Sequence, residues 1–291
     1  KLLFFVPDNP LSAFISTWVL ARCLQDDEKL VCHIYATKQT AAFFENLPAK
    51  KVMHIRGEAG GFRDWLRIMR ACMGKYWFRV IDGYKGRYGS FLWARHRYYF
   101  FLPEHLYSLP DPVRPNRRVT GCLWVNPAVD SPLPEKLPDD VPVVVFAPEE
   151  GYRARWTGRD DAELAVRLLG HAGPFAGGHL VVMGAAREHQ GMQDIAANLP
   201  AGQMSLIEDA SVSARAALMR RATMLVGTDR LAARMAWVAA VRHIVRLEAR
   251  EEETAVPYNL HAGTDVATLA EILSEMHAKA TTNALPFANQ R

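Results

Sequence analysis

The residues that follow Gly227 have the types and the spacing that could hold a phosphate. An apolar strand pattern ends at Gly227, and an apolar helical pattern begins two or three residues later. Thr228 or Asp229 can cap that helix, and the backbone N–H groups of its first turn then form an anion site. Arg230 and Arg234 would add positive charge there. A plain capped helix accounts for the same residues, so the local pattern leaves both interpretations open.

Two further strand ends carry polar residues that suit a nucleotide. The strand ending at Ala147 runs into a loop with Arg153 and Arg155, which could neutralise a diphosphate. The strand ending at Met183 is followed by Glu188, which could accept hydrogen bonds from ribose hydroxyls. Alternatively, the loop is solvated with paired charges, and Glu188 complements the dipole of its own helix.

The first predicted strand leads into a turn that contains one carboxylate, Asp8. Asp8 and Asn9 precede Pro10, and proline is tolerated at the first position of a helix. The turn is therefore either a helix start capped by Asp8 or Asn9, or a place where Asp8 faces a ligand and acts as a general base.

The charge is distributed unevenly along the chain. Residues 50–118 contain fifteen Lys or Arg and five acidic residues, a net charge of +10, whereas residues 1–49 carry −1 and residues 119–291 carry −5. This basic segment suggests an anionic partner, such as a phosphorylated saccharide, a lipid surface or a nucleic acid. A solvated basic face is the alternative.

The composition excludes several classes of protein. With 49% apolar and 23% charged residues among 291, the chain is globular and not disordered. No apolar run approaches the roughly 18–20 residues of a membrane span, and the apolar run 2–6 is predicted to be a strand, not a signal peptide. The four cysteines are far apart and the ten histidines form no HxH or HxxxH pair. We therefore expect a reducing, cytoplasmic compartment and no metal site.

Short apolar runs alternate with helical patterns, which predicts parallel sheets covered by helices on both faces. The predicted strands are 2–6, 30–36, 52–56, 78–82, 98–102, 143–147, 179–183, 204–207, 223–227 and 243–247, with a further short one at 121–125. The predicted helices are 10–24, 37–46, 62–73, 84–94, 160–170, 188–199, 212–222, 231–240 and 266–277. We expect the strand 98–102 to be buried.

A proline-rich stretch divides the chain. Nine prolines lie between residues 103 and 142, a density that interrupts helices and central strands. We therefore predict an N-terminal α/β domain at 1–120, a linker at 121–140 and a second α/β domain at 141–291, with a cleft between their sheets. In such sheets ligands lie beyond the carboxyl ends of the strands.

Taken together, these segments resemble glycosyltransferase family nine, the ADP-heptose:lipopolysaccharide heptosyltransferases. The likeness covers most of the chain, and its second half carries most of it. The segments that resemble family motifs are a Pro-Gly loop ending in a basic-x-Trp motif (147–156), a strand (181–184), a helix (209–222), the signature with its aspartate (223–237), a strand (78–83) and the basic segment after it (85–97).

The resemblance implies a GT-B architecture: two Rossmann-like domains, each a doubly wound parallel α/β sheet, facing across a cleft. It also implies a metal-independent, inverting transfer without a cofactor, in which an aspartate of the first βα loop deprotonates the acceptor. The nucleotide sugar, most often an ADP-sugar, would be held by the second domain. The positions that would bind it are Arg153, Arg155, Glu188, Thr228, Asp229, Arg230 and Arg234, and those that would bind the acceptor are Lys85 and Arg87.

Four positions depart from the family pattern. Ala13, after Ser12, stands where the family has its catalytic aspartate, so Asp8 is the only carboxylate of the first βα loop that could be the base. The other three departures are Arg230-Leu231 for Ser/Thr-Gly, Arg234 for a histidine and Ala154 for a lysine.

These observations predict a cytoplasmic enzyme that transfers a sugar from a nucleotide-diphosphate donor to an anionic bacterial surface glycan or glycolipid, with peripheral contact with the inner membrane. The alternative is a catalytically degenerate GT-B protein that binds a nucleotide sugar or a protein partner without transfer. A nucleic-acid partner rests on charge alone and is not expected.

Overall fold

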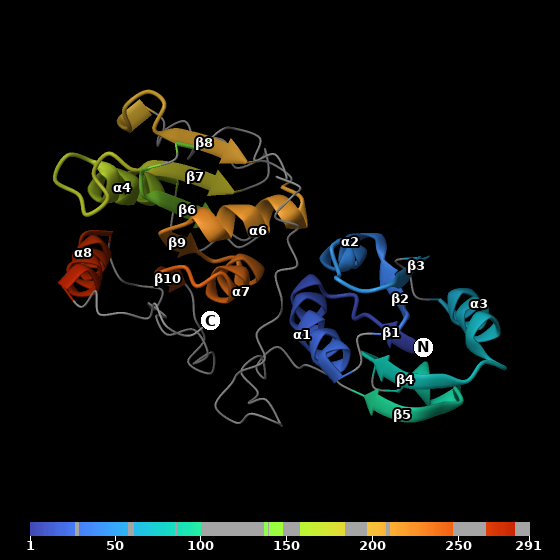
Figure 1. Ribbon diagram of the computed structural model, residues 1–291. Coiled ribbons are helices and arrows are strands. Elements are labelled where there is room, and N and C mark those ends of the chain that lie inside the picture. The colour runs from blue at the N-terminus through green and yellow to red at the C-terminus, as the bar shows by residue number, and fades with distance from the viewer. Residues whose placement is uncertain are drawn as a thin grey trace. The chain divides into compact units, whose positions relative to one another are not determined.

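The computed structural model describes residues 1–26, 29–57, 61–84, 86–99, 137–138, 140–147, 158–183, 197–207, 210–246 and 266–282. The chain divides into two compact units, one of residues 1–130 with 211–213 and the other of residues 131–210 with 214–291. Figure 1 shows one parallel sheet in each unit. The predicted boundaries at 120 and 140 fall in or beside residues outside the described part and stay predictions.

Unit 1 is built on five parallel strands in the order β3-β2-β1-β4-β5. Its strands are β1 (Leu2–Phe5), β2 (Cys32–Thr37), β3 (Lys51–Arg56), β4 (Trp77–Asp82) and β5 (Ala94–Tyr99). The central strand β1 is buried along its whole length, and Phe4 lies in register with Ile34 of β2 and Ile81 of β4. Four of the five strands lie within two residues of their predicted bounds. Buried apolar runs mark β1, β2 and β4, whereas β3 is mostly exposed or half-buried.

Helices cover both faces of this sheet, as predicted. Alternate residues of β1 serve the two faces: Phe4 packs edge-on against Phe44, with 5.6 Å between ring centroids, whereas Leu3 and Phe5 belong to the cluster that α3 completes with Ile68, Met69 and Cys72. The helices of unit 1 are α1 (Pro10–Asp26), α2 (Lys38–Ala41), the 3₁₀ turn η1 (Ala42–Phe44) and α3 (Phe62–Cys72).

The predicted helix at 84–94 is wrong. The chain there forms turns and a short 3₁₀ helix, η2 (Gly89–Phe91). The carboxylate of Asp82, which is fully buried, accepts hydrogen bonds from the backbone N–H groups of Tyr84 (2.7 Å), Tyr88 (2.9 Å) and Gly89 (2.6 Å). The loop therefore wraps around this carboxylate instead of forming a helix.

Two other predictions for unit 1 need correction. The helix expected at 37–46 is split, because the side chains of Thr37 and Thr40 form a capping box that begins the four-residue α2, and η1 follows it. The strand expected at 98–102 begins four residues earlier, as β5, and residues 95–98 are exposed instead of buried. β5 is an edge strand, and charged side chains on an edge discourage pairing with other chains.

Unit 2 repeats the topology of unit 1. Its strands are β6 (Val143–Ala147), β7 (His179–Met183), β8 (Met204–Ile207), β9 (Met224–Gly227) and β10 (His243–Arg246), in the order β10-β9-β6-β7-β8 and all parallel. Counted from the first strand of each unit, both sheets have the order 3-2-1-4-5. β6, β7 and β8 have the predicted bounds.

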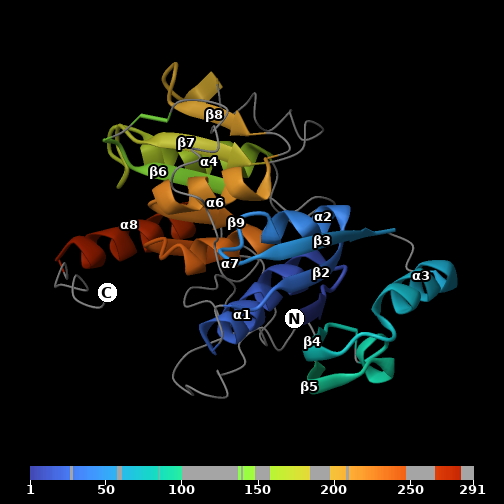
Figure 2. The same ribbon diagram turned by 45° about the vertical axis from the view of Figure 1, so that its right-hand side comes forward.

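The helices of unit 2 also cover both faces of the sheet. α4 and α8 pack on one face, where Leu168 and Leu273 share a cluster with Phe146 and Val226. Figures 1 and 2 show α6 and α7 against the other face. These helices are α4 (Gly158–Leu169), α6 (Val212–Arg221), α7 (Arg230–Val238) and α8 (Val266–Thr282). The predicted helix 188–199 lies mostly, and the short strand 121–125 wholly, outside the described residues.

The common topology places one switch point in each unit. The chain first adds two strands on one side of the first strand and then crosses to its other side. The switch lies between β1 and β4 in unit 1 and between β6 and β9 in unit 2. Ligands of doubly wound sheets bind at this point, beyond the carboxyl ends of the strands. The residues that follow β1, β4, β6 and β9 are therefore the candidates for function.

Among the described residues, Cys23, Cys32 and Cys72 are buried and form no disulfide. Within the described residues, no helix combines the length and the apolar character that crossing a bilayer requires.

Candidate functional site

In unit 1 the turn after β1 shows which of Asp8 and Asn9 caps the following helix, a choice that the sequence left open. The side chain of Asn9 accepts a hydrogen bond from the N–H of Ser12 at 3.0 Å, and its carbonyl accepts from Ala13 at 2.9 Å. Asn9 therefore caps α1, with Pro10 at the first helical position. Asp8 is not needed as a cap.

The carboxylate of Asp8 is held by side chains from two other strand ends. Arg56, at the end of β3, donates from Nη2 to Oδ1 of Asp8, and the Tyr84 hydroxyl lies 2.8 Å from the same oxygen. The guanidinium of Arg56 is almost completely buried, whereas the side chain of Asp8 is 47% exposed. Its second oxygen, Oδ2, has no hydrogen-bond partner among the residues that the structure describes, so it can accept a proton from a ligand.

Two tyrosines complete this cluster at the switch point. Arg56 donates from Nη2 to the hydroxyl of Tyr84 and from Nη1 to that of Tyr88, the latter at 3.3 Å. The Tyr84 hydroxyl also lies 2.7 Å from the carbonyl oxygen of Val6 and can donate to it or to Asp8. Burial, with a smaller contribution from the charge of Asp8, raises the pKa of Tyr84 well above its ordinary value. Tyr84 is therefore a proton donor that stays protonated.

The loop that carries these tyrosines also carries the two predicted acceptor-binding residues. Arg87 is exposed, with its guanidinium carbon 5.9 Å from the centre of the Tyr88 ring, and its carbonyl accepts from the indole N–H of Trp65 at 3.3 Å. Lys85 lies outside the described residues. The cluster of Asp8, Arg56 and Tyr84 and the exposed Arg87 thus belong to one edge of unit 1.

Ala13, which the resemblance predicts to stand at the position of a catalytic aspartate, is closed to ligands. Ala13 is completely buried in the first turn and a half of α1, and Ser12 beside it is also buried. Neither residue offers a carboxylate or access to solvent. Asp8 is the only carboxylate that the described residues between β1 and α1 contain.

In unit 2 the turn after β9 is tighter. Gly227 has φ +157°, and a Cβ there would overlap the carbonyl oxygen of Ala147 at the end of β6. That oxygen instead accepts from the backbone N–H groups of Thr228 and Asp229, both at 3.0 Å. The glycine lets β9 approach β6 closely and turn into α7 after only two residues.

Asp229 caps α7, so of the two predicted caps the structure selects this one. Its Oδ1 accepts from the N–H of Ala232 at 2.9 Å, and its Oδ2 lies 3.7 Å from Nη1 of Arg215 on α6. Thr228 is buried, and Arg230 is the first residue of the helix. The positive end of α7 and Arg230 make this strand end suitable for an anion.

Of the other residues predicted to bind the nucleotide, the structure describes only Arg234. Arg234 is one turn into α7 and almost completely buried, with its guanidinium carbon 5.0 Å from the centre of the Trp237 ring. Arg153, Arg155 and Glu188 lie outside the described residues, and their roles stay predictions. Within the described ranges no group of three His, Cys, Asp or Glu side chains could hold a metal ion.

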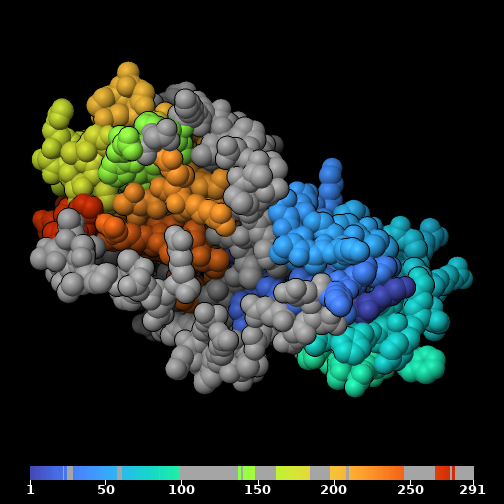
Figure 3. Space-filling view, in the orientation of Figure 1, coloured from blue at the N-terminus to red at the C-terminus, as the bar shows by residue number. Residues whose placement is uncertain are grey.

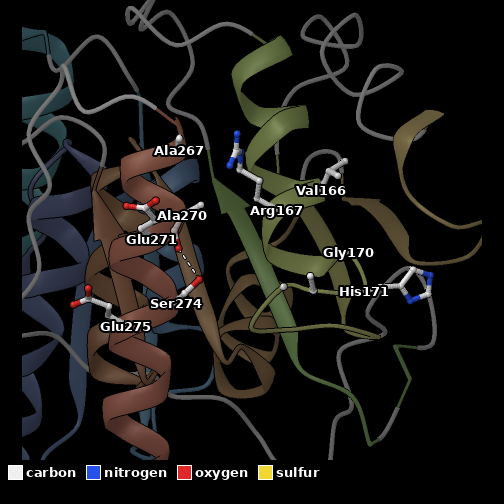
Figure 4. A pocket seen from close by; sticks show the side chains of 11 residues that line it. Val166, Arg167, Gly170, His171, Ala267, Ala270, Glu271, Ser274 and Glu275 are labelled. Atoms are coloured by element: carbon white, nitrogen blue, oxygen red, sulfur yellow. Dashed lines mark hydrogen bonds between the residues drawn. The ribbon is translucent and has the colours of Figure 1, made fainter.

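A separate pocket of about 700 Å³ lies between α4 and α8 (Figure 4). Its lining includes Arg167, which pairs with Glu163 at 2.8 Å, and Ser274, which donates to the carbonyl of Ala270 at 2.7 Å. The carboxyl end of α4 leads into β7, so the pocket lies at the amino edge of the sheet. The described lining contains none of the predicted site residues.

Comparison with solved structures shows the same architecture along almost the whole chain. A glycosyltransferase of family nine from Veillonella parvula has a TM-score of 0.70 at 13% identity, with 97% of this chain and 96% of the other covered. The ADP-heptose lipopolysaccharide heptosyltransferase II of E. coli has a TM-score of 0.68 at 13% identity, with coverages of 97% and 99%. The E. coli heptosyltransferase WaaC with ADP has a TM-score of 0.66 at 12% identity, with coverages of 96% and 99%.

No protein-family model and no curated protein matches the chain in sequence. The fold predicted from the sequence, an α/β fold of the GT-B type, is confirmed, and so is the structural resemblance to family nine. Arg56 was not predicted as a site residue, and no structural role was predicted for Asp82. The one available signal was a basic residue on the last position of an apolar strand, where parallel sheets gather ligand-binding groups.

Proposed function

We propose that the protein is a metal-independent, inverting glycosyltransferase. It moves a sugar from a nucleoside-diphosphate donor, an ADP-sugar in the first instance, to an anionic glycan or glycolipid of the bacterial surface. The proposal places it in the cytoplasm. The observation that carries it is the likeness of nearly the full chain to heptosyltransferases, one of them described with ADP, together with polar residues at both switch points.

Unit 2 would bind the donor. The first turn of α7 and Arg230 supply positive potential for the diphosphate, and Thr228 lies beside it at the end of β9. Arg153 and Arg155 would add charge from the loop after β6, and Glu188 would contact the ribose. Asp229 would contribute indirectly, because it caps the helix α7 whose first turn would bind the diphosphate.

Unit 1 would supply the base. Oδ2 of Asp8 removes the proton from the acceptor hydroxyl, whose oxygen attacks the anomeric carbon as the bond to the diphosphate breaks. The nucleoside diphosphate leaves with the bonding electron pair, and the sugar inverts its configuration. Arg56 and Tyr84 hold Oδ1, so the carboxylate has a fixed orientation. Arg87 and Lys85 would contact the anionic acceptor.

Calorimetry with ADP, UDP and GDP tests donor binding. We expect one of them to bind with a dissociation constant of about 100 µM or better, and Arg230→Glu to weaken binding by about tenfold or more. Arg167→Glu, which makes the same charge reversal at an exposed arginine of unit 2 on the opposite edge of the sheet, is the matched control and should leave the affinity unchanged. Binding no better than millimolar for all three diphosphates would refute the proposal.

Transfer itself is the second readout. Release of the preferred nucleoside diphosphate from its sugar, dependent on an added anionic glycan or glycolipid, supports the enzyme. A chain that binds the diphosphate tightly but transfers to no acceptor would instead be the degenerate binding protein.

A further inference from the structure

Unit 1 exposes an unusual set of large aromatic side chains. Phe62 is 72% exposed, Trp93 73%, Phe91 64% and Tyr76 56%. With the half-buried Trp65 they form two groups of ring contacts: centroids are 5.7 Å apart for Phe62–Trp65 and 6.1 Å for Trp65–Phe91 in one group, and 6.3 Å for Tyr76–Trp93 in the other. Phe91 and Trp93, one from each group, are separated in sequence by Leu92 alone. We call these five residues the aromatic strip.

The strip is fixed at the surface by the packing beneath it. Leu92 is extended, with φ −101° and ψ 145°, and its side chain is buried in the core. Phe91, the last residue of η2, and Trp93, on the other side of Leu92, are both exposed. The indole N–H of Trp65 is bound to the carbonyl of Arg87 at 3.3 Å. Residues 61–99, cyan to green, form an outer surface of this unit (Figure 3).

The part of the chain that carries the aromatic strip is strongly basic. Residues 61–99 contain nine Lys or Arg and only two acidic residues, Asp64 and Asp82. Asp82 is buried and bound to backbone N–H groups, and Asp64 pairs with Arg67 at 2.6 Å. Among the described residues of this region the exposed cations are Arg63, Arg67, Arg70, Lys75, Arg87, Arg95 and Arg97.

We propose that the aromatic strip and its basic surroundings dock the protein on an anionic bilayer. Aromatic side chains enter the headgroup region of a membrane, and Lys and Arg attract anionic lipid, each by about 1 kcal/mol near the surface. Single-stranded nucleic acid fits less well, because base stacking needs free ring faces and the rings of Phe62 and Trp65 stack on each other at 20°. The inference rests on exposure and charge and stands without the transferase.

Sedimentation with vesicles tests the proposal on the full chain. We expect binding to phosphatidylcholine vesicles that contain about 30% phosphatidylglycerol, at least about tenfold weaker binding to pure phosphatidylcholine, and loss of binding at high salt. The double variant Phe91→Ser with Trp93→Ser should bind the anionic vesicles about tenfold more weakly or worse. Val166→Ser, which removes an exposed apolar side chain of unit 2, should bind like the wild type.

Lys75→Glu with Arg63→Glu should weaken vesicle binding without changing the melting temperature by more than a few degrees, because all these substitutions are at the surface. Failure of the wild type to bind anionic vesicles would overturn the proposal. An equal loss of vesicle binding in Val166→Ser would also overturn it. The same holds if the wild type is a dimer and the Phe91/Trp93 variant is a monomer, because the strip would then be an interface between two copies. Calorimetry with the nucleoside diphosphate separates this outcome from failure of the proposed function.

Discussion

In each unit an aspartate lies between a strand at the switch point and the helix that follows it: Asp8 between β1 and α1, and Asp229 between β9 and α7. The two aspartates have different partners. In unit 1 four residues separate β1 from α1, and Asn9 takes the cap, so Asp8 is bound by the side chains of Arg56 and Tyr84. In unit 2 only two residues separate β9 from α7, and Asp229 is itself the cap.

The difference shows how turn length decides whether a carboxylate is available for chemistry. In Asp229 one carboxylate oxygen accepts from the backbone N–H group of Ala232, and the other pairs with Arg215. The longer turn of unit 1 gives the cap to the neighbouring residue and leaves one oxygen of Asp8 without a described partner. The short turn of unit 2 instead brings the first turn of a helix, with its positive end, next to the strand edge.

The largest effect that we expect on stability comes from the glycine of the short turn. Gly227→Ala should lower the free energy of unfolding by about 3 kcal/mol or more, because the added Cβ would overlap the carbonyl of Ala147. Gly202→Ala is the control, since Gly202 also has positive φ but open space around it, and should cost about 1 kcal/mol. Denaturant unfolding measures both. Equal losses would show that the close approach to β6 is not what the glycine serves.

Low pH should lower the stability of unit 2 through protonation of His243. Burial, and then the positive charges of His277 and Arg242, lower the pKa of His243 from 6.5 to about 4. The unfolded chain binds this proton below about pH 6.5 and the folded one does not, so stability is complete above that pH and falls as the pH drops towards 4, by at most about 3 kcal/mol. Melting temperatures between pH 7.5 and 4.5 should show a smaller decrease for His243→Gln. An unchanged slope would contradict this assignment.

The caps test the comparison of the two turns directly. Asp229→Ala and Asn9→Ala should each lower the free energy of unfolding by about 1 kcal/mol, because each leaves an N–H of a first helical turn unbound. Asp229→Asn should retain most of the stability, since an amide oxygen caps as well. If Asp229→Asn costs as much as Asp229→Ala, the charge of Asp229 matters and not its role as a cap.

The smallest effect belongs to the ion pair of Asp229 with Arg215. The two charged atoms are 3.7 Å apart, and both side chains are partly exposed. We therefore expect the ion pair itself to contribute less than about 0.5 kcal/mol to the loss of unfolding free energy in Arg215→Ala. The dependence of the melting temperature on salt should be the same in the variant and the wild type. A loss above about 1 kcal/mol would make this pair a structural counterpart of Arg56 and Asp8.

Much of this fold can be predicted from the sequence, because many of its strands are short runs rich in apolar residues. β6 and β7, which are completely buried, have their predicted bounds for that reason, and β8 has them with every second residue buried. The loop after β4 could not be predicted, because its helical-looking pattern is overridden by a buried carboxylate that binds three backbone N–H groups. β5 was misplaced because its first half is charged, as suits an edge strand.

The candidate site was predictable only in part. Asp8 and Asp229 could be named because a carboxylate between a strand and a helix is a local pattern. The choice between Asp8 and Asn9 as the cap depends on backbone geometry. Arg56 was missed because it is 48 residues from Asp8 in sequence, and only the order of the strands brings the two together.

The most direct test of the account is the single-turnover rate of sugar transfer by Asp8→Asn at saturating donor. The amide keeps an oxygen for Arg56 and Tyr84 and leaves Asn9 as the cap, so the fold and the affinity for the nucleoside diphosphate should stay within a few fold of the wild type. Without the base, we expect the rate to fall by at least about a hundredfold. A rate within a few fold of the wild type would show that Asp8 is not the base.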